Sequence, residues 1–195
     1  MDAARPGKPC FPLYTEGKDM IKGRPSKGSD FMQNEKPTLH LMVGLPCSGK
    51  TTYARKHSQE WRAMVFTPDE WQIPLFGDDF GQAEHDARHS AIERLMWQAA
   101  GQLLSLGVSV VLDYGFWAKE ERDGLRRWAM QQGAACRIHY MDTPLEEIAR
   151  RLEARNQHTG DRVFRIEMED ILGWAKLFEA PEPEEIEGAR RGEQP

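Results

Sequence analysis

The sequence predicts an α/β protein with a mostly parallel sheet and helices on both of its faces. Short apolar segments alternate with longer amphipathic ones along most of the chain, which is the pattern of successive strand–helix units. The most apolar segment, Val108–Asp113, is rich in β-branched residues, as buried parallel strands are. At 195 residues the chain has room for one such domain. Folds of this class bind ligands at the carboxyl ends of their strands, so the residues that end each strand are candidates for function.

Four segments are predicted to be strands. Leu39–Val43 is apolar, follows Pro37 and leads into a glycine-rich loop. Val108–Asp113 ends in an acid and is followed by a turn. In chain order the predicted strands are 39–43, 62–66, 108–113 and 135–142.

Five helices are predicted between and after these strands. The longest carries apolar residues at helical spacing and ends at Gly107. Pro144 opens a later helix, whereas the proline, glycine and aspartate content of 74–81 predicts a loop. In chain order the predicted helices are 51–57, 84–105, 119–132, 144–152 and 167–178.

Composition divides the chain into three parts. Residues 1–36 contain several prolines and glycines without hydrophobic periodicity, which predicts a flexible extension. Residues 37–181 form the predicted domain, and 182–195 form a predicted acidic, flexible tail. Within the domain, the polar segment 156–165 predicts a small mobile lid.

Several classes of protein are excluded by composition and charge. No apolar run approaches the ~18 residues of a transmembrane helix, and the N-terminus lacks the apolar core of a signal peptide. Cys10, Cys47 and Cys136 are too few and too widely spaced for a disulfide framework or metal cluster, which favours a reducing cytoplasm. A net charge of −5 argues against a protein whose function requires binding to nucleic acid. The oligomeric state stays open.

The glycine-rich loop fits the phosphate-binding pattern G-x-x-x-x-G-K-[ST] between a strand and a helix. Such a loop turns successive backbone N–H groups and a helix N-terminus toward one anion. Lys50 would reach the β- and γ-phosphates, and the Thr51 hydroxyl would bind Mg²⁺. The predicted nucleotide-binding residues are Gly44, Leu45, Pro46, Cys47, Ser48, Gly49, Lys50, Thr51 and Thr52. Cys47 is either a small residue at a variable position or a thiol activated by the helix N-terminus.

Two acids follow predicted strands beside this loop. Asp69 comes directly after the second strand and can take the proton of an acceptor hydroxyl. The alternative for Asp69 is an N-cap of the next helix. Asp113 ends the third strand and is expected to order the Mg²⁺ shell, or else to contact the acceptor or serve as a turn residue.

Arginines surround the predicted lid. Arg151 and Arg155 lie four residues apart on one helical face. Arg155 and Arg162 bracket the lid and could close over the γ-phosphate, stabilising charge in the transition state. Arg155 is therefore a predicted catalytic residue together with Lys50 and Asp69, and Arg151 and Arg162 are predicted nucleotide contacts.

The segment from Pro68 to Glu93 is strongly acidic. Its only basic residue apart from histidine is Arg88, so its net charge is 1 − 7 = −6. Its acids are Asp69, Glu70, Asp78, Asp79, Glu84, Asp86 and Glu93. If they face the acceptor, they favour a neutral or cationic molecule over a polyanion; alternatively, half of them face solvent. His85 and His89 share a helical face, but a metal pair there is disfavoured.

The chain resembles a family of small P-loop kinases that includes chloramphenicol phosphotransferase, zeta-toxin-like kinases and the kinase half of polynucleotide kinase. The resemblance runs from about Leu39 to Pro181 and rests on five motifs: G-L-P-C-S-G-K-T-T, F-T-P-D-E-W, V-V-L-D-Y-G-F-W, the R-x-x-x-R-N of 151–156, and F-E-A-P near Phe178. It implies that Asp69 is the base and that Arg155 and Arg162 contact ATP. Polynucleotide-binding members are expected to carry an arginine a few residues past the base, whereas here Glu-Trp-Gln-Ile follows Asp69.

Together these features predict an ATP- and Mg²⁺-dependent kinase. Its acceptor is expected to be a hydroxyl of a small molecule, such as an antibiotic or other natural product. The alternatives are a polynucleotide or nucleoside 5′-hydroxyl kinase and a non-catalytic ATP-binding regulatory module. A GTPase switch would carry an N-K-x-D signature, and the sequence has none. The identity of the acceptor and the choice of ATP over GTP stay open.

Overall fold

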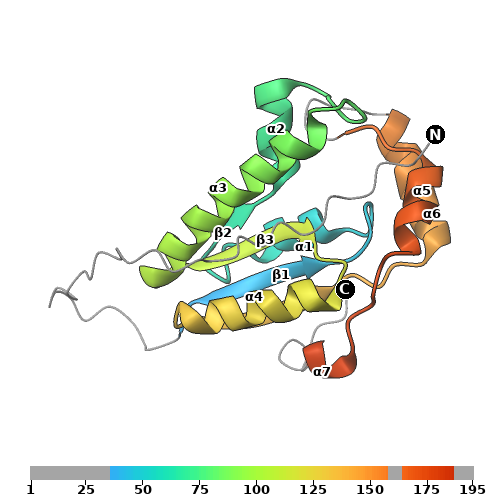
Figure 1. Ribbon diagram of the computed structural model, residues 1–195. Coiled ribbons are helices and arrows are strands. Elements are labelled where there is room, and N and C mark those ends of the chain that lie inside the picture. The colour runs from blue at the N-terminus through green and yellow to red at the C-terminus, as the bar shows by residue number, and fades with distance from the viewer. Residues whose placement is uncertain (1–35, 158–163, 187–195) are drawn as a thin grey trace, which may run out of the picture.

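A four-stranded parallel sheet forms the centre of the computed structural model, which describes residues 36–157 and 164–186 (Figure 1). The strands lie in the order β2-β3-β1-β4, and every pairing between them is parallel. They are β1 Thr38–Val43, β2 Ala63–Phe66, β3 Ser109–Gly115 and β4 Ala135–Tyr140. The predicted α/β class and parallel sheet are confirmed.

Helices cover both faces of this sheet (Figure 1). Leu39 and Leu41 of β1 point to the face covered by α3 and α4, where they pack with Met96 and Leu125. Met42, on the alternate side of the strand, packs with Ala54 of α1 on the opposite face. The described helices are α1 Lys50–His57, α2 Pro68–Phe76, α3 His85–Ser105, α4 Lys119–Gln131, α5 Leu145–Gln157, α6 Met168–Ala175 and α7 Pro183–Ile186.

A smaller apolar cluster joins α5 and α6 to the phosphate-binding loop at the carboxyl end of the sheet (Figure 1). Ile148 and Leu152 of α5 pack with Ile166 and with Ile171 of α6. Leu45 of the loop packs against the same cluster. The helix that precedes the predicted lid is thereby fixed against the loop that would hold a nucleotide.

On the α1 face, an imidazole–indole stack replaces ordinary aliphatic packing. His40 and His139 are buried, and their Nδ1 and Nε2 atoms lie 2.9 Å apart. Trp61 stacks on both rings, with centroid distances of 4.2 Å to His40 and 4.5 Å to His139. The stack ties β1 and β4 to the turn that follows α1.

The structure differs from the predicted elements in several places. The helix predicted over 144–152 runs on to Gln157 as α5, so the first two residues of the predicted lid are helical. The predicted loop 74–81 begins inside α2, which contains Pro74 and ends at Phe76, before its C-cap Gly77. The fully buried Gln72 anchors this helix to Asp79, so tertiary contacts override the helix-breaking tendency of proline. The predicted flexible tail begins too early, because Glu185 is buried against Arg122 in a short helix.

Other predictions fall outside the described residues. These are the extension over 1–35, the end of the tail over 187–195, and 158–163 of the lid, which include Arg162. In the described ranges, no helix combines the length and the apolar composition that a bilayer crossing requires.

Candidate active site

The phosphate-binding loop depends on two glycines. Gly44 has φ +145°, and a Cβ there would lie 2.8 Å from Ser48 Oγ and 3.0 Å from the Met141 carbonyl oxygen. Its N–H donates to the Gly115 carbonyl at 3.2 Å, which fixes the loop to the end of β3. Gly49 has φ +104° and begins α1. Side chains rarely adopt these conformations, so the motif glycines are required by the backbone path.

Lys50 and Thr51 begin α1, directly after the loop. Lys50 Nζ donates to the Leu45 carbonyl at 2.8 Å, so the ammonium folds over the loop. Burial lowers the pKa of Lys50, and the carboxylates of Asp113 and Asp69 oppose that shift. Thr51 Oγ1 donates to Asp113 Oδ2 at 2.6 Å. The structure thus joins the loop to an acid near the carboxyl end of β3.

Thr51 and Asp113 fit a magnesium ion. Asp113 is 6% exposed, and its Oδ1 is buried with no hydrogen-bond partner among the residues that the structure describes. Thr67 Oγ1 and Thr51 Oγ1 both point to Oδ2, leaving Oδ1 for another ligand. Mg²⁺ prefers oxygen ligands and takes only one or two from protein, completing its shell with phosphate and water. Among the described residues, no group of three or more His, Cys, Asp or Glu side chains is placed to hold a metal ion.

Asp69 lies in the first turn of α2, beside the end of β2. The N-cap of α2 is Thr67, so the alternative assignment of Asp69 as N-cap is wrong. Burial raises the pKa of Asp69 and Asp113 raises it further, whereas His89, Arg155 and Lys50 lower it. Asp69 therefore belongs to the same electrostatic cluster as the loop lysine and the predicted metal ligand.

Arg151 and Arg155 both turn from α5 toward the loop. Arg151 Nη1 donates to the Ser48 carbonyl at 3.0 Å, and Arg155 Nη1 lies 3.5 Å from Cys47 Sγ. Arg155 Nη2 also donates to the Phe164 carbonyl at 2.5 Å. Within the described ranges, the buried Nε of Arg155 has no hydrogen-bond partner. Arg155 thus connects the loop to the segment that follows the lid.

The acidic side chains of residues 68–93 do not share one environment: some are buried or paired, and others are exposed. Asp79 is fully buried and accepts from Gln72 Nε2, His85 Nδ1 and Arg88 Nη1, each at 2.9 Å. Burial alone would raise the pKa of Asp79, but these hydrogen bonds hold it at about 2. Asp79 therefore cannot face an acceptor, which corrects the prediction. Glu70 and Glu93 are also paired, with Arg55 and His89, whereas Asp78, Glu84 and Asp86 are exposed.

Four aromatic rings from separate segments meet beside the connection between α2 and α3. Phe80 lies 6.2 Å from Phe164 and 6.4 Å from Trp174, measured between ring centroids. Trp174 also lies 5.6 Å from Trp117, which follows β3. Sequence reasoning missed this contact because the four rings come from separate segments with no shared periodicity.

Arg122 is a second feature that sequence reasoning missed. Its fully buried guanidinium donates to the carbonyls of Phe116, Trp117 and Glu179 and pairs with Glu185 through two hydrogen bonds, at 2.9 and 3.2 Å. It therefore holds the turn after β3 against the C-terminal segment. The F-E-A-P motif was the available signal, because it contains Glu179.

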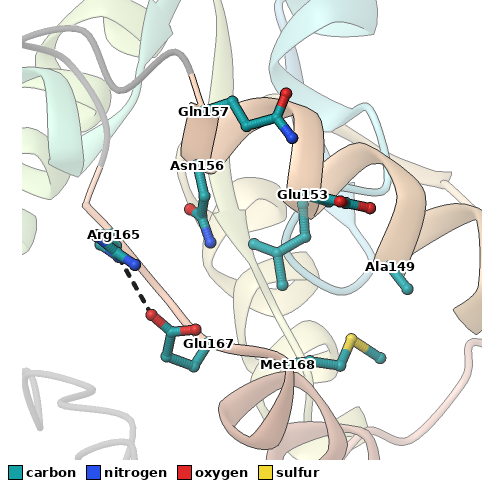
Figure 2. Close-up of a pocket in the computed structure, with 8 residues that line it drawn as sticks. Ala149, Glu153, Asn156, Gln157, Arg165, Glu167 and Met168 are labelled. Atoms are coloured by element: carbon teal, nitrogen blue, oxygen red, sulfur yellow. Dashed lines mark hydrogen bonds and ion pairs between the residues drawn. The ribbon is translucent and has the colours of Figure 1, made fainter.

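Figure 2 shows a separate pocket of about 350 Å³ between α5 and the segment leading into α6. Asn156 and Gln157 line it from the end of α5, opposite Arg165 and Glu167, which form an ion pair at 3.2 Å. Lys50 is not among its lining residues. The pocket therefore lies between α5 and the segment before α6 rather than at the phosphate-binding loop.

A protein-family model described as an AAA domain, AAA_33, matches residues 39–181. The chain belongs to this family. The match has the limits that the motifs indicated, and the predicted relationship to small P-loop kinases is confirmed. No curated protein matches the sequence.

Solved structures with the same fold include several kinases. A chain of the Pnkp1/Rnl/Hen1 RNA repair complex is 22% identical with a TM-score of 0.62, over 77% of this chain and 46% of that one. A gluconokinase from Sinorhizobium meliloti is 18% identical with a TM-score of 0.53, over 78% and 81%. A sugar kinase from Janibacter sp. is 19% identical with a TM-score of 0.50, over 78% and 82%. The AAA_33 chain thus spans less than half of the RNA repair protein, and these likenesses show the fold alone.

Proposed function

We propose that this AAA_33 protein is an ATP- and Mg²⁺-dependent phosphotransferase that moves the γ-phosphate to a hydroxyl of a small molecule. The observation that carries the proposal is the convergence of Lys50, Asp69, Asp113 and Arg155 in one partly buried electrostatic cluster beside the phosphate-binding loop. A phosphoryl-transfer site needs a charge clamp, a metal-binding oxygen and a base, and these four residues supply them.

In this mechanism Asp69 orients the acceptor hydroxyl and takes its proton. The acceptor oxygen forms a bond to the γ-phosphorus as the bond between that phosphorus and the β,γ-bridging oxygen breaks, and ADP leaves with the electron pair. Lys50 and Arg155 stabilise the charge on the transferring group. Thr51 and Asp113 would hold Mg²⁺, which neutralises phosphate charge when bound. The Asp69 proton is then released to solvent.

A small neutral or cationic acceptor is favoured by the charge of the predicted acceptor side, the segment from Pro68 to Glu93. The exposed acids Asp78 and Asp86 leave the surrounding surface negative, which suits a neutral or cationic molecule. An antibiotic or natural product is the expected class, in line with the resemblance to chloramphenicol phosphotransferase.

A polynucleotide 5′-hydroxyl kinase is the second candidate. The fold similarity to a chain of an RNA repair complex favours it. The residues after Asp69 weigh against it, because Glu70 pairs with Arg55 and Gln72 is fully buried. Neither offers a positive group to a nucleic-acid phosphate.

An ADP-release assay against polyols, aminoglycosides, nucleosides and oligonucleotides tests the proposal. With the best acceptor, Asp69→Asn should lower kcat by roughly 10²–10⁴-fold and leave ATP affinity little changed, since it removes the base but not the phosphate contacts. Lys50→Ala should abolish turnover, whereas Lys56→Ala, exposed on the same helix, serves as the matched control. Turnover that survives Lys50→Ala would refute the proposed function. An oligonucleotide as best substrate would favour the second candidate.

A further inference from the structure

A buried chain of hydrogen bonds runs from Asp79 to His89 between α2 and α3. The Asp79 carboxylate can only accept, so the Gln72 atom 2.9 Å from its Oδ1 must be the Nε2 donor. That orientation turns Gln72 Oε1 toward His89 Nδ1 at 2.8 Å. The oxygen can only accept, so Nδ1 of His89 must carry a proton.

The other ring nitrogen of His89 faces a second acceptor. Its Nε2 lies 3.3 Å from Glu93 Oε1. An imidazole held between two acceptors satisfies both only when both nitrogens carry protons, which is the imidazolium form. Burial alone would lower the pKa of His89, but the hydrogen bond and charge of Glu93 and the charges of Asp69 and Asp86 raise it.

We propose that His89 is a positioning residue for the transfer reaction: Gln72 and Glu93 hold its ring as a cation whose charge keeps Asp69 a carboxylate ready to take the acceptor proton. This inference rests on the proposed function, and it gives the acidic segment a role other than substrate attraction. Asp79 orients Gln72, and Gln72 orients His89.

The charges around Asp69 support this role. His89 of α3 lowers its pKa more than Arg155 of α5 or Lys50 of α1 does, while burial and Asp113 of β3 raise it. Without His89, therefore, the carboxyl would hold its proton to higher pH and could not act as a base there. Around His89 itself, Glu93 and Asp86 come from its own helix and Asp69 comes from α2.

Titration of the histidine resonances by NMR tests the pairing without any turnover. Linkage is reciprocal, so Asp69→Asn should lower the titration midpoint of His89, whose signals are assigned by their loss in His89→Gln. The matched control is Asp78→Asn, an exposed acid of the same segment that should leave the midpoint in place. An unchanged midpoint in Asp69→Asn would overturn the inference, whether or not the protein proves to be a kinase.

The pH profile of kcat, measured with saturating ATP–Mg²⁺ and the best acceptor, tests the consequence. His89→Gln keeps a donor for Gln72 but carries no charge. It should lower kcat about 10-fold near pH 6 and no more than about 2-fold near pH 9, with KM for ATP unchanged. Glu93→Gln, at a partly exposed position, should shift the low-pH side of the kcat profile in the same direction as His89→Gln does, but by a smaller amount.

A loss of kcat by one factor at every pH would mean that His89 is merely structural, and the inference would fall. If the wild-type protein binds ATP but phosphorylates none of the acceptors, the proposed function fails, and with it the catalytic role of His89. The NMR midpoints then still decide whether the charged pair exists, so the two failures can be told apart.

Discussion

Acidification should destabilise the folded protein through His40 and His139, the buried imidazoles of the stack on Trp61. They are 3% and 8% exposed, and a hydrogen bond between their ring nitrogens requires at least one neutral ring. Burial, assisted by His139 and Arg137, lowers the pKa of His40 to about 3. Burial, assisted by Arg137 and His57, lowers the pKa of His139 to about 4.

The size of this loss of stability follows from the difference in proton binding between the folded and the unfolded chain. An unfolded histidine titrates near 6.5, so at pH 5 the unfolded chain binds protons that these two rings in the folded chain do not. The stability is therefore complete above the unfolded pKa and is lost as the pH falls below it. At about 1.4 kcal/mol per pH unit, the loss from pH 7.5 to pH 5 is about 2 kcal/mol per ring and about 4 kcal/mol for both. A typical domain has only about 5–15 kcal/mol in total.

Equilibrium urea unfolding at the two pH values, followed by tryptophan fluorescence, measures this loss. Burial raises the pKa of Glu121 to about 7, which stabilises the fold on acidification and opposes the histidines. For this reason the wild type must be compared with His40→Leu/His139→Leu, in which Glu121 is unchanged. We expect the wild type to lose about 4 kcal/mol more than the double variant between pH 7.5 and pH 5. Equal losses in the two proteins would refute the argument that the rings are held neutral.

Three further predictions concern the loop and its supports. Glu185→Gln leaves the buried guanidinium of Arg122 without its counter-charge and should lower the free energy of unfolding by about 3 kcal/mol or more, measured in urea against the exposed control Glu184→Gln. Gly44→Ala should raise the dissociation constant of ATP–Mg²⁺, measured by calorimetry, about tenfold or more. The alanine Cβ would clash with Ser48, and its backbone would carry ~1–3 kcal/mol of strain at this positive φ. Its control is Gly133→Ala, which also has positive φ but meets no atom within 4 Å and should keep its affinity. Alkylation of Cys47 by iodoacetamide, followed by peptide mass spectrometry, should slow when ATP–Mg²⁺ is added, because the thiol lies in the loop beside Arg155.

The sequence predicted the parts of the site that depend on local pattern. Asp69 and Asp113 were recognisable because Asp69 closely follows β2 and Asp113 lies near the end of β3, and parallel strands bring their carboxyl ends to one edge. The motif likewise predicted the positions of Lys50 and Thr51. The burial of Asp79 could not be predicted from local pattern, because nothing in the neighbouring sequence shows that Gln72, His85 and Arg88 surround it.

Contacts between residues far apart in sequence also explain why the prediction of a flexible C-terminal tail was wrong. An acidic, proline-containing segment is typical of a solvated tail, and that composition predicted flexibility after Pro181. Glu185 is nevertheless buried, because its partner Arg122 lies 63 residues away in sequence. A buried charge needs such a partner, and pairing at this distance leaves no periodic signal in a single sequence.

The loop contacts also indicate how nucleotide binding would proceed. Lys50 and Arg151 donate to carbonyls of the loop itself, and Arg155 points to the sulfur of Cys47. These neutral acceptors are weaker partners for a cation than phosphate oxygens, with which charge-assisted hydrogen bonds are about twice as strong. The cations are already held within reach of the loop by α1 and by the packing of α5, so exchanging carbonyl for phosphate requires little ordering of side chains. The fold therefore gathers its positive groups around the loop in advance, so in the proposed reaction the energy of phosphate binding would remain available for aligning the acceptor with Asp69.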